Sequence, residues 1–399
     1  MSSSALIGPE QEARWRQRIR EALFVPDPLP PLERQFHGQF APEPGVVVER
    51  VSYATQFGMR IPAILYRPDP LPAPRLPALI VVNGHGGDKF SWYPHYSGIL
   101  YARAGGVVLT YDPTGEGERN AERQSGTREH DRIEPPDELA QRLAGLMLTD
   151  LMQAVSYLRQ RPDVDPWRIA AAGYSMGSLV LAFGGAVELR LRACALVGGG
   201  NLDGPGEYWD RAKPMCTGIP YRALSFLGDR AAALYVLQAS RGPTLLYNGM
   251  EDEVVNIPAT GEPFLRDMRQ RAAALRGGED GLFEYGFCPG ASHRPHFVSK
   301  PVALWLHRQL AFPRWSEGAI AAMPETHVSE WAAKTGAATD PFYATEHREG
   351  GTMALDTGIP GLTREQLCVY GADEWERLKP RLVHETWRVE ARRRIAEKG

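Results

Sequence analysis

The chain has 399 residues, of which 43% are hydrophobic and 23% charged, and its formal net charge is −3. This size and balance are typical of a globular protein with one large domain or two ordinary ones. The near-neutral charge lacks the basic footprint of a nucleic-acid-binding protein. The first twenty residues have no continuous apolar core, so they do not resemble a signal peptide, and no apolar run approaches membrane-spanning length. We therefore expect a cytoplasmic protein with neither nucleic acid nor membrane as a partner.

Residues 1–45 read as a short helix followed by a proline-rich strap, PDPLPPLE. From residue 46 onward, short apolar runs alternate with longer helix-like segments, a rhythm that predicts a mostly parallel central sheet flanked by helices. Two alternating strands are expected to pair antiparallel around the turn at Phe57-Gly58. The predicted strands cover residues 46–54, 61–68, 76–84, 106–112, 168–175, 193–200, 243–249 and 282–290.

Helical spacing of apolar residues appears at 138–160, at 263–275 and after His296 through residue 310. We therefore predict an α/β catalytic domain over 46–311. A long insertion at 201–241, after the sixth strand, is a possible substrate cap. Residues 312–399 form a C-terminal extension, with a predicted helix over 373–396, that we expect to pack on the domain or to mediate a homo-oligomer.

The motif that carries chemistry is Gly173-Tyr174-Ser175-Met176-Gly177. A G-x-S-x-G string is weak evidence alone, but here it ends a predicted strand and opens an apolar helix, which is the setting of a nucleophile elbow. Glycines are needed there because the strand and helix backbones crowd together around the serine. Ser175 is therefore the predicted nucleophile.

A serine hydroxyl needs a base to remove its proton, and the base needs an acid to orient it. His293 follows the last predicted strand and is preferred over its neighbour His296, which already begins a helix. Asp252 lies just beyond the penultimate strand and is preferred over Glu251, Glu253 and the reserve candidate Asp203. We predict a Ser175–His293–Asp252 triad.

An oxyanion hole requires two preorganised N–H donors. We expect the backbone N–H groups of Met176 and His85 to supply them, with Gly86 as the alternative to His85. Gly86, Trp92, Tyr174 and Trp209 are candidate walls of the substrate pocket, although aromatic residues near the glycine loop, such as Tyr93 and Tyr96, are equally often core. The loop lacks a P-loop signature and the remaining histidines show no metal-ligand spacing, so no cofactor and no metal are expected.

Four ordered elements, the NGHGG loop, the elbow, the acid loop and the late histidine, together resemble the α/β-hydrolase superfamily over residues 46–310. The DPTGEGER segment (112–119) is similar to the acetyl xylan esterase and dienelactone hydrolase-like branch. The chain departs from dienelactone hydrolases, which use a cysteine where this chain has Ser175. It also departs from glucuronoyl esterases, which place an arginine where this chain has Met176.

The resemblance implies a carboxylic ester hydrolase of acetyl or short-acyl type that acts on a small-molecule ester through an acyl-enzyme and needs no cofactor. The same triad also serves amides, thioesters, C–C bonds and acyl transfer, and a silent scaffold protein is a further alternative. Glu116, Glu118 and Arg119 are expected to brace the loops through ion pairs rather than to react.

Overall fold

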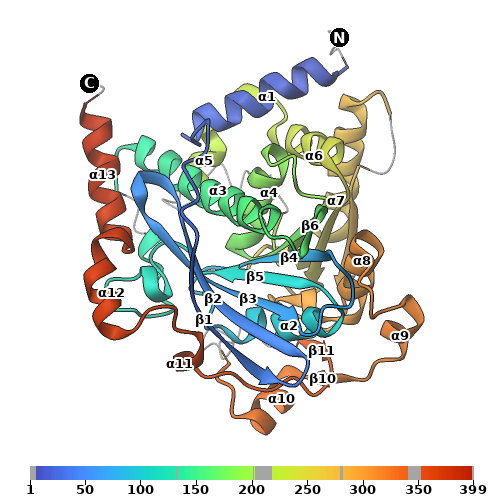
Figure 1. Ribbon diagram of the computed structural model, residues 1–399. Coiled ribbons are helices and arrows are strands. Elements are labelled where there is room, and N and C mark those ends of the chain that lie inside the picture. Colours follow the sequence, from blue (N-terminus) through green and yellow to red (C-terminus); the bar gives the residue numbers. More distant parts are fainter. Residues whose placement is uncertain are drawn as a thin grey trace.

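The computed structural model describes residues 6–131, 134–200, 202, 218–278, 282–339 and 352–397. A single large twisted sheet runs through the molecule, and helices cover both of its faces (Figure 1). The strand order is β1-β2-β3-β5-β4-β6-β7-β8-β9. The strands are β1 Gln35–Glu43, β2 Val46–Ala54, β3 Arg60–Pro68, β4 Leu76–Val82, β5 Val107–Tyr111, β6 Val164–Tyr174, β7 Ala193–Val197, β8 Thr244–Gly249 and β9 Glu284–Cys288.

The direction of the strands follows the sequence pattern. β2 and β3 pair antiparallel around the turn at Gln56–Gly58, as predicted, and β3 pairs antiparallel with β5. From β5 to β9 all neighbouring strands are parallel. Every residue of β4 is buried, which explains its continuous apolar run, because a central parallel strand is covered on both faces. The mostly parallel α/β sheet predicted from the sequence is confirmed.

The first strand, β1, was not predicted. It lies within the segment interpreted as a strap and pairs antiparallel with β2 at the edge of the sheet. None of its residues is buried, and its sequence QFHGQFAPE includes glycine, proline and polar residues. Such a sequence carries no strand periodicity, and only the neighbouring β2 makes it a strand.

Two apolar layers fill the space between the sheet and the helices. One face packs against seven helices from all parts of the chain, namely α1 Pro9–Ala22, α3 Asp137–Arg159, α4 Met176–Val187, α5 Gly218–Ala223, α6 Arg230–Arg241, α7 Ile257–Leu275 and α13 His384–Ala396. The other face is covered by α2 Trp92–Arg103, α8 Lys300–Leu310 and the C-terminal extension. In Figure 1, α3 and α4 lie above the sheet and α2 lies below it.

The C-terminal extension packs across the domain. Its elements are α9 Glu317–Ala322, β10 Glu325–His327, α10 Val328–Thr335, β11 Met353–Leu355, α11 Arg364–Leu367, α12 Ala372–Leu378 and α13. Trp331 and Trp375 are buried in the layer around α2, and Trp387 of α13 is buried in the opposite layer. The Tyr96 hydroxyl of α2 donates a hydrogen bond of 2.7 Å to the Leu355 carbonyl. The extension is thus part of the core.

The single helix predicted over 373–396 was wrong. The structure has two helices, α12 and α13, separated by a short 3-10 turn at Lys379–Arg381. Pro380 lies in that turn, and a proline inside a helix removes one backbone hydrogen bond and clashes with the preceding turn. The break lets α12 and α13 contact different layers of the molecule.

Part of the possible cap insertion is an ordinary flanking helix. The side chain of Gln238 on α6 donates hydrogen bonds of 3.0 and 3.1 Å to the carbonyls of Leu181 and Ala182 on α4. This places α6 in the helical layer beside the sheet, not over the strand ends. Residues 203–217, in the first half of the predicted cap, lie outside the described residues. Within the described part of the chain, no helix combines the length and apolarity needed to cross a bilayer.

Candidate active site

Ser175 occupies a strained backbone position between β6 and α4. β6 ends at Tyr174, α4 begins at Met176, and Ser175 has φ 52° and ψ −115°. A non-glycine residue in this region is strained, and such strain persists only where the surrounding structure enforces it. The arrangement is the sharp strand-to-helix turn expected of a nucleophile elbow.

The two glycines of the motif allow this turn to form. A Cβ at position 173 would lie 2.3 Å from the carbonyl oxygen of Gly177. A Cβ at position 177 would lie 2.2 Å from the carbonyl oxygen of Val82, at the end of β4. Both distances are far inside van der Waals contact, so only glycine fits at either position. The elbow therefore presses directly against the end of the neighbouring strand.

Asp252 and His293, 41 residues apart in the sequence, meet in the structure. His293 Nδ1 lies 2.8 Å from Asp252 Oδ2, and both side chains are fully buried. A carboxylate only accepts hydrogen bonds, so His293 Nδ1 carries the proton and Nε2 carries the free lone pair. Nε2 is buried and has no hydrogen-bond partner within the described residues. The backbone N–H of Val255 donates 3.2 Å to Asp252 Oδ1 and fixes the carboxylate.

The alternatives to these two residues are placed differently. Glu251 and Glu253 are exposed, and Asp203 lies outside the described residues. His296 is buried at the start of a 3-10 turn, and burial lowers its pKa to about 4. Asp252 faces both histidines, but its hydrogen bond goes to His293.

Two neighbours hold the imidazole of His293 in place. The Tyr174 hydroxyl donates a hydrogen bond of 3.1 Å to the His293 carbonyl, and the two rings lie 5.0 Å apart. Gly198, with φ +61°, follows β7 and approaches both rings. A Cβ there would lie 3.1 Å from Tyr174 Cε2 and 3.2 Å from His293 Cε1. Tyr174, predicted as a pocket wall, thus connects the elbow to the histidine.

The glycine loop after β4 packs against the elbow. A Cβ at Gly84 would lie 2.9 Å from Tyr174 Cδ1 and 3.1 Å from Ser175 Cβ. His85 follows Gly84 in this loop. Met176 opens α4, where the first backbone N–H groups have no acceptor within the helix. The two predicted oxyanion donors therefore belong to the two segments, the glycine loop and the start of α4, that meet at the elbow.

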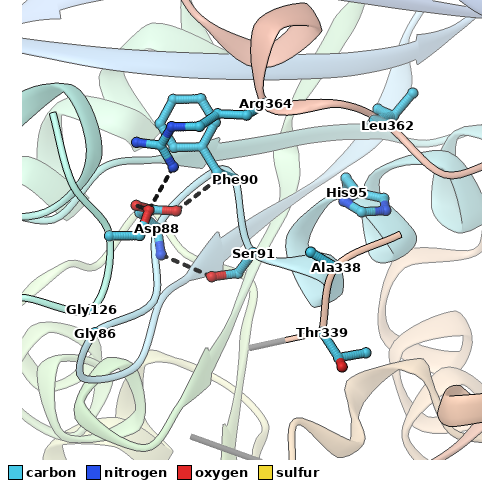
Figure 2. A pocket seen from close by; sticks show the side chains of 11 residues that line it. Gly86, Asp88, Phe90, Ser91, His95, Gly126, Ala338, Thr339, Leu362 and Arg364 are labelled. Atoms are coloured by element: carbon cyan, nitrogen blue, oxygen red, sulfur yellow. Dashed lines mark hydrogen bonds between the residues drawn. The ribbon is translucent and has the colours of Figure 1, made fainter. Parts of the chain in front are cut away.

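A cavity of about 250 Å³ lies beside the glycine loop (Figure 2). Gly86, Asp88 and His95 line it from the domain, and Leu362 and Arg364 line it from the C-terminal extension. The Arg364 guanidinium lies 3.8 Å from the centroid of the Phe90 ring. Ser175 is not among the lining residues, so this cavity does not contain the elbow.

The other predicted pocket residues are distributed between core and undescribed segments. Trp92 is 1% exposed, and its ring contacts the rings of Tyr93, Tyr96 and Trp331. That environment is an aromatic core cluster between α2 and α10. Trp209 lies outside the described residues.

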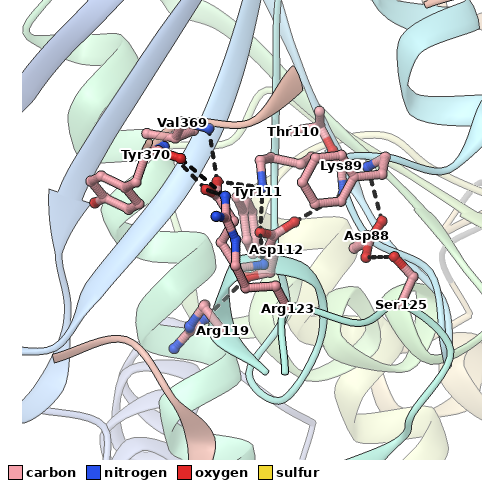
Figure 3. Close-up of polar contacts among 12 residues, drawn as sticks. Asp88, Lys89, Thr110, Tyr111, Asp112, Arg119, Arg123, Ser125, Val369 and Tyr370 are labelled. Atoms are coloured by element: carbon pink, nitrogen blue, oxygen red, sulfur yellow. Dashed lines mark hydrogen bonds and ion pairs between the residues drawn. The ribbon is translucent and has the colours of Figure 1, made fainter. Parts of the chain in front are cut away.

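The DPTGEGER segment forms a buried charge network (Figure 3). Lys89 Nζ lies 2.5 Å from Asp112 Oδ2 and 2.9 Å from Glu118 Oε2, and all three side chains are fully buried. Glu118 also accepts hydrogen bonds of 2.8 and 3.0 Å from the backbone N–H groups of Val369 and Tyr370. The network therefore joins the glycine loop, the segment after β5 and the C-terminal extension.

The other two residues expected in this network have separate partners. Arg119 pairs with Asp150 of α3 at 2.5 Å, and both are buried. Glu116 accepts hydrogen bonds from the backbone N–H groups of Thr127 and Arg128, and burial raises its pKa to about 8. Glu116 thus braces a loop through backbone contacts.

One cluster of metal-ligand side chains was missed in the sequence. His85, His130 and Asp131 come together beside the glycine loop, and one potential ligand atom from each lies within 4.8 Å of the others. The histidines are 45 residues apart on two loops, so no short sequence motif indicates a metal site there. Burial lowers the pKa of His130 to about 3, so its imidazole is neutral.

The strand order, the crossover helices and the serine elbow define the α/β-hydrolase fold. Solved structures support this assignment. An acetyl xylan esterase from Paenibacillus sp. R4 superposes with a TM-score of 0.50 and 19% identity, over 76% of this chain and 95% of that one. Acetyl xylan esterase 1 from Thermoanaerobacterium sp. JW/SL YS485 gives 0.50 and 16%, over 78% and 99%. The methylesterase BT1017 gives 0.54 and 20%, over 78% and 67%.

In sequence, the chain is similar to YtaP of Bacillus subtilis (strain 168), whose name describes it as a hydrolase. The identity is 26% over 172 residues, which cover 38% of this chain and 55% of YtaP. The match therefore spans about half of that relative. No family model matches the chain. The expected resemblance to acetyl xylan esterases is confirmed at the level of the fold.

Proposed function

We propose that this protein hydrolyses carboxylic esters through a covalent acyl-enzyme formed on Ser175. The observation that carries the proposal is the combination of a strained serine with a buried Asp252–His293 pair whose Nε2 lone pair has no hydrogen-bond partner in the described chain. A base in this tautomer is ready to take a proton from a serine hydroxyl. The names of the structural relatives, two acetyl xylan esterases and a methylesterase, support an ester as the substrate.

The reaction proceeds in two steps, acylation of Ser175 and hydrolysis of the acyl-enzyme. Ser175 Oγ attacks the ester carbonyl while His293 Nε2 takes the hydroxyl proton, and the C–O bond to the alcohol breaks as His293 returns that proton to the leaving oxygen. Water then attacks the acyl-enzyme by the same route and releases the acid. Asp252 keeps the Nδ1 proton in place and stabilises the imidazolium that forms in each half.

The negative charge of the tetrahedral intermediate is stabilised by the backbone N–H groups of Met176 and His85. The position of Met176 at the start of α4 adds the positive end of the helix dipole. The close approach of Gly84 to Ser175 Cβ supports the glycine loop as the source of the second donor. We assign the acyl group to the acetyl or short-acyl class. A panel of esters, amides and thioesters with matched acyl groups, assayed with and without acyl acceptors, would distinguish ester hydrolysis from the other reactions of the same triad.

The test is labelling with a fluorophosphonate probe, followed by peptide mass mapping. We expect one adduct, on Ser175, and none in Ser175→Ala. Hydrolysis of p-nitrophenyl acetate by Ser175→Ala should fall about 10⁴-fold or more, because the nucleophile of a triad is removed. The control is Ser240→Ala on α6. The Ser240 hydroxyl contacts the Leu237 carbonyl, so this variant should be labelled at Ser175 and hydrolyse the ester like the wild type. Unchanged turnover by a folded Ser175→Ala protein would refute the proposal.

A further inference from the structure

The cluster of His85, His130 and Asp131 contains three side chains of the kinds that bind transition metals. His85 Nε2 lies 3.3 Å from Asp131 Oδ1. The two imidazole rings are nearly parallel, 9° apart, with centroids separated by 5.4 Å. His85 comes from the glycine loop after β4, and the other two residues come from the 3-10 turn at Glu129–Asp131. None of the three side chains is a member of the Ser175–His293–Asp252 triad, although the backbone N–H of His85 is the proposed second oxyanion donor.

The orientation of His130 is that of a metal ligand. Its Nδ1 lies 3.0 Å from the Thr114 carbonyl oxygen, which can only accept, so Nδ1 carries the proton. Nε2 is then the lone-pair nitrogen, and it is fully buried without a hydrogen-bond partner in the described structure. Metal-binding histidines typically donate their second ring N–H to a carbonyl or carboxylate, which fixes the ring and the tautomer. A buried imidazole nitrogen with no donor to satisfy it is otherwise a cost to the fold.

The distances suit one shared ion. Two imidazoles bound through Nε2 to one tetrahedral zinc ion have centroids about 5 Å apart, given Zn–N bonds of about 2.0–2.1 Å. The observed centroid separation of 5.4 Å is close to that value, and one ring must turn from the nearly parallel, stacked orientation for both lone pairs to face one ion. The His85–Asp131 separation of 3.3 Å is also near the edge of a tetrahedral coordination shell, about 3.4 Å for bonds of this length. The candidate ligand atoms lie within 4.8 Å of one another, so the widest pair would close by up to about 1.4 Å to reach that edge.

We propose that His85, His130 and Asp131 form a binding site for a divalent transition-metal ion, and that zinc is the ion that best suits these ligands. Two imidazole nitrogens and one carboxylate oxygen favour such an ion over calcium or magnesium, which prefer all-oxygen ligands. The side chains of His85 and Asp131 are 12% and 26% exposed, so the ion has a route from solvent, and water completes its coordination.

The ion would join the glycine loop to the loop that ends at Asp131. Because the backbone of His85 follows Gly84, which packs on Ser175, an ion on its side chain fixes the segment that supplies the second oxyanion donor. That consequence rests on the proposed esterase function, whereas the binding of the ion does not. The metal has a structural role here, and it takes no part in the bond changes at Ser175.

The test titrates metal-depleted full-length protein with Zn²⁺ in competition with a chromogenic chelator, and with Co²⁺ followed by its visible absorption spectrum. We expect one equivalent of metal per chain and the intense visible bands of a tetrahedral cobalt site. Asp131→Asn should weaken binding at least about 10-fold, because even residues that only support a metal ligand contribute about 10–100-fold to affinity. His130→Gln should abolish the cobalt spectrum.

The matched control is Asp165→Asn. Asp165 is ion-paired to Arg168 at the start of β6 and has a similar side-chain exposure, 24%, so its variant should bind metal like the wild type. Ser175→Ala should also bind normally, which separates this proposal from the esterase mechanism. Folding of each variant is checked by circular dichroism. The proposal is overturned if wild type binds no zinc or cobalt, or if folded Asp131→Asn binds as tightly as wild type.

Discussion

Replacing Lys89 by methionine would test how much the buried charge network contributes to the fold. Lys89 Nζ faces Asp112 at 2.5 Å and Glu118 at 2.9 Å, and none of the three side chains is exposed. Methionine retains much of the apolar stem but removes the cation. Glu118 would still pair with Arg123 at 2.8 Å. Among the described residues, Asp112 would keep only the hydrogen bonds from the backbone N–H groups of residues 89 and 118.

The expected loss follows from that asymmetry. In the variant, Glu118 remains paired, whereas Asp112 becomes a buried charge without a cation. We therefore expect the free energy of unfolding to fall by about 3–5 kcal/mol. Burial already raises the pKa of Asp112 to about 6. Lys89 lowers the pKa of Asp112, so its removal raises that pKa further, and the difference between variant and wild type should be largest at high pH and shrink as the pH falls toward about 6.

The assay is urea unfolding followed by circular dichroism and tryptophan fluorescence, at pH 8 and pH 5. The control is Lys300→Met, which removes a partly exposed ion pair to Glu325 at 3.7 Å and should cost about 1 kcal/mol or less. A Lys89→Met protein within about 1 kcal/mol of wild type at pH 8 would contradict the reasoning, since it would mean that water or a compensating shift screens Asp112.

Two further predictions concern His293 and pH. Gly198→Ala should lower kcat/KM for p-nitrophenyl acetate at least about 10-fold, because the new Cβ meets the His293 and Tyr174 rings and misplaces the base. Gly228→Ala has a similar φ, +74°, with nothing within 4 Å, so it should lose about 1–2 kcal/mol of stability but keep its activity. His95 is buried with its pKa lowered to about 4, so unfolding takes up a proton and stability falls as pH drops from about 6.5. His95→Gln should make that acid loss shallower by up to about 3 kcal/mol in pH-dependent unfolding, and an unchanged slope would exclude His95 as its source.

The sequence alone determined the features that depend on local chemistry. The apolar runs between residues 76 and 249 predicted the central parallel strands, because such strands are buried on both faces whatever their partners. Gly173 and Gly177 around Ser175 predicted the elbow, because only residues without a side chain fit where strand and helix cross. The order of serine, acid and histidine along the chain also selected the pair of residues that the structure places 2.8 Å apart.

The tertiary structure alone decided the features that depend on partners distant in the chain. β1 has no strand pattern of its own and exists through its pairing with β2. The C-terminal extension gave no recognisable motif, yet Glu118 and the aromatic layer around Trp331 bind it to the domain. His85 and His130 lie on loops 45 residues apart, and only the crossing of those loops makes them neighbours. The local pattern of apolar residues indicates which faces of a segment are buried, whereas contacts between side chains distant in the sequence depend on how the whole chain packs.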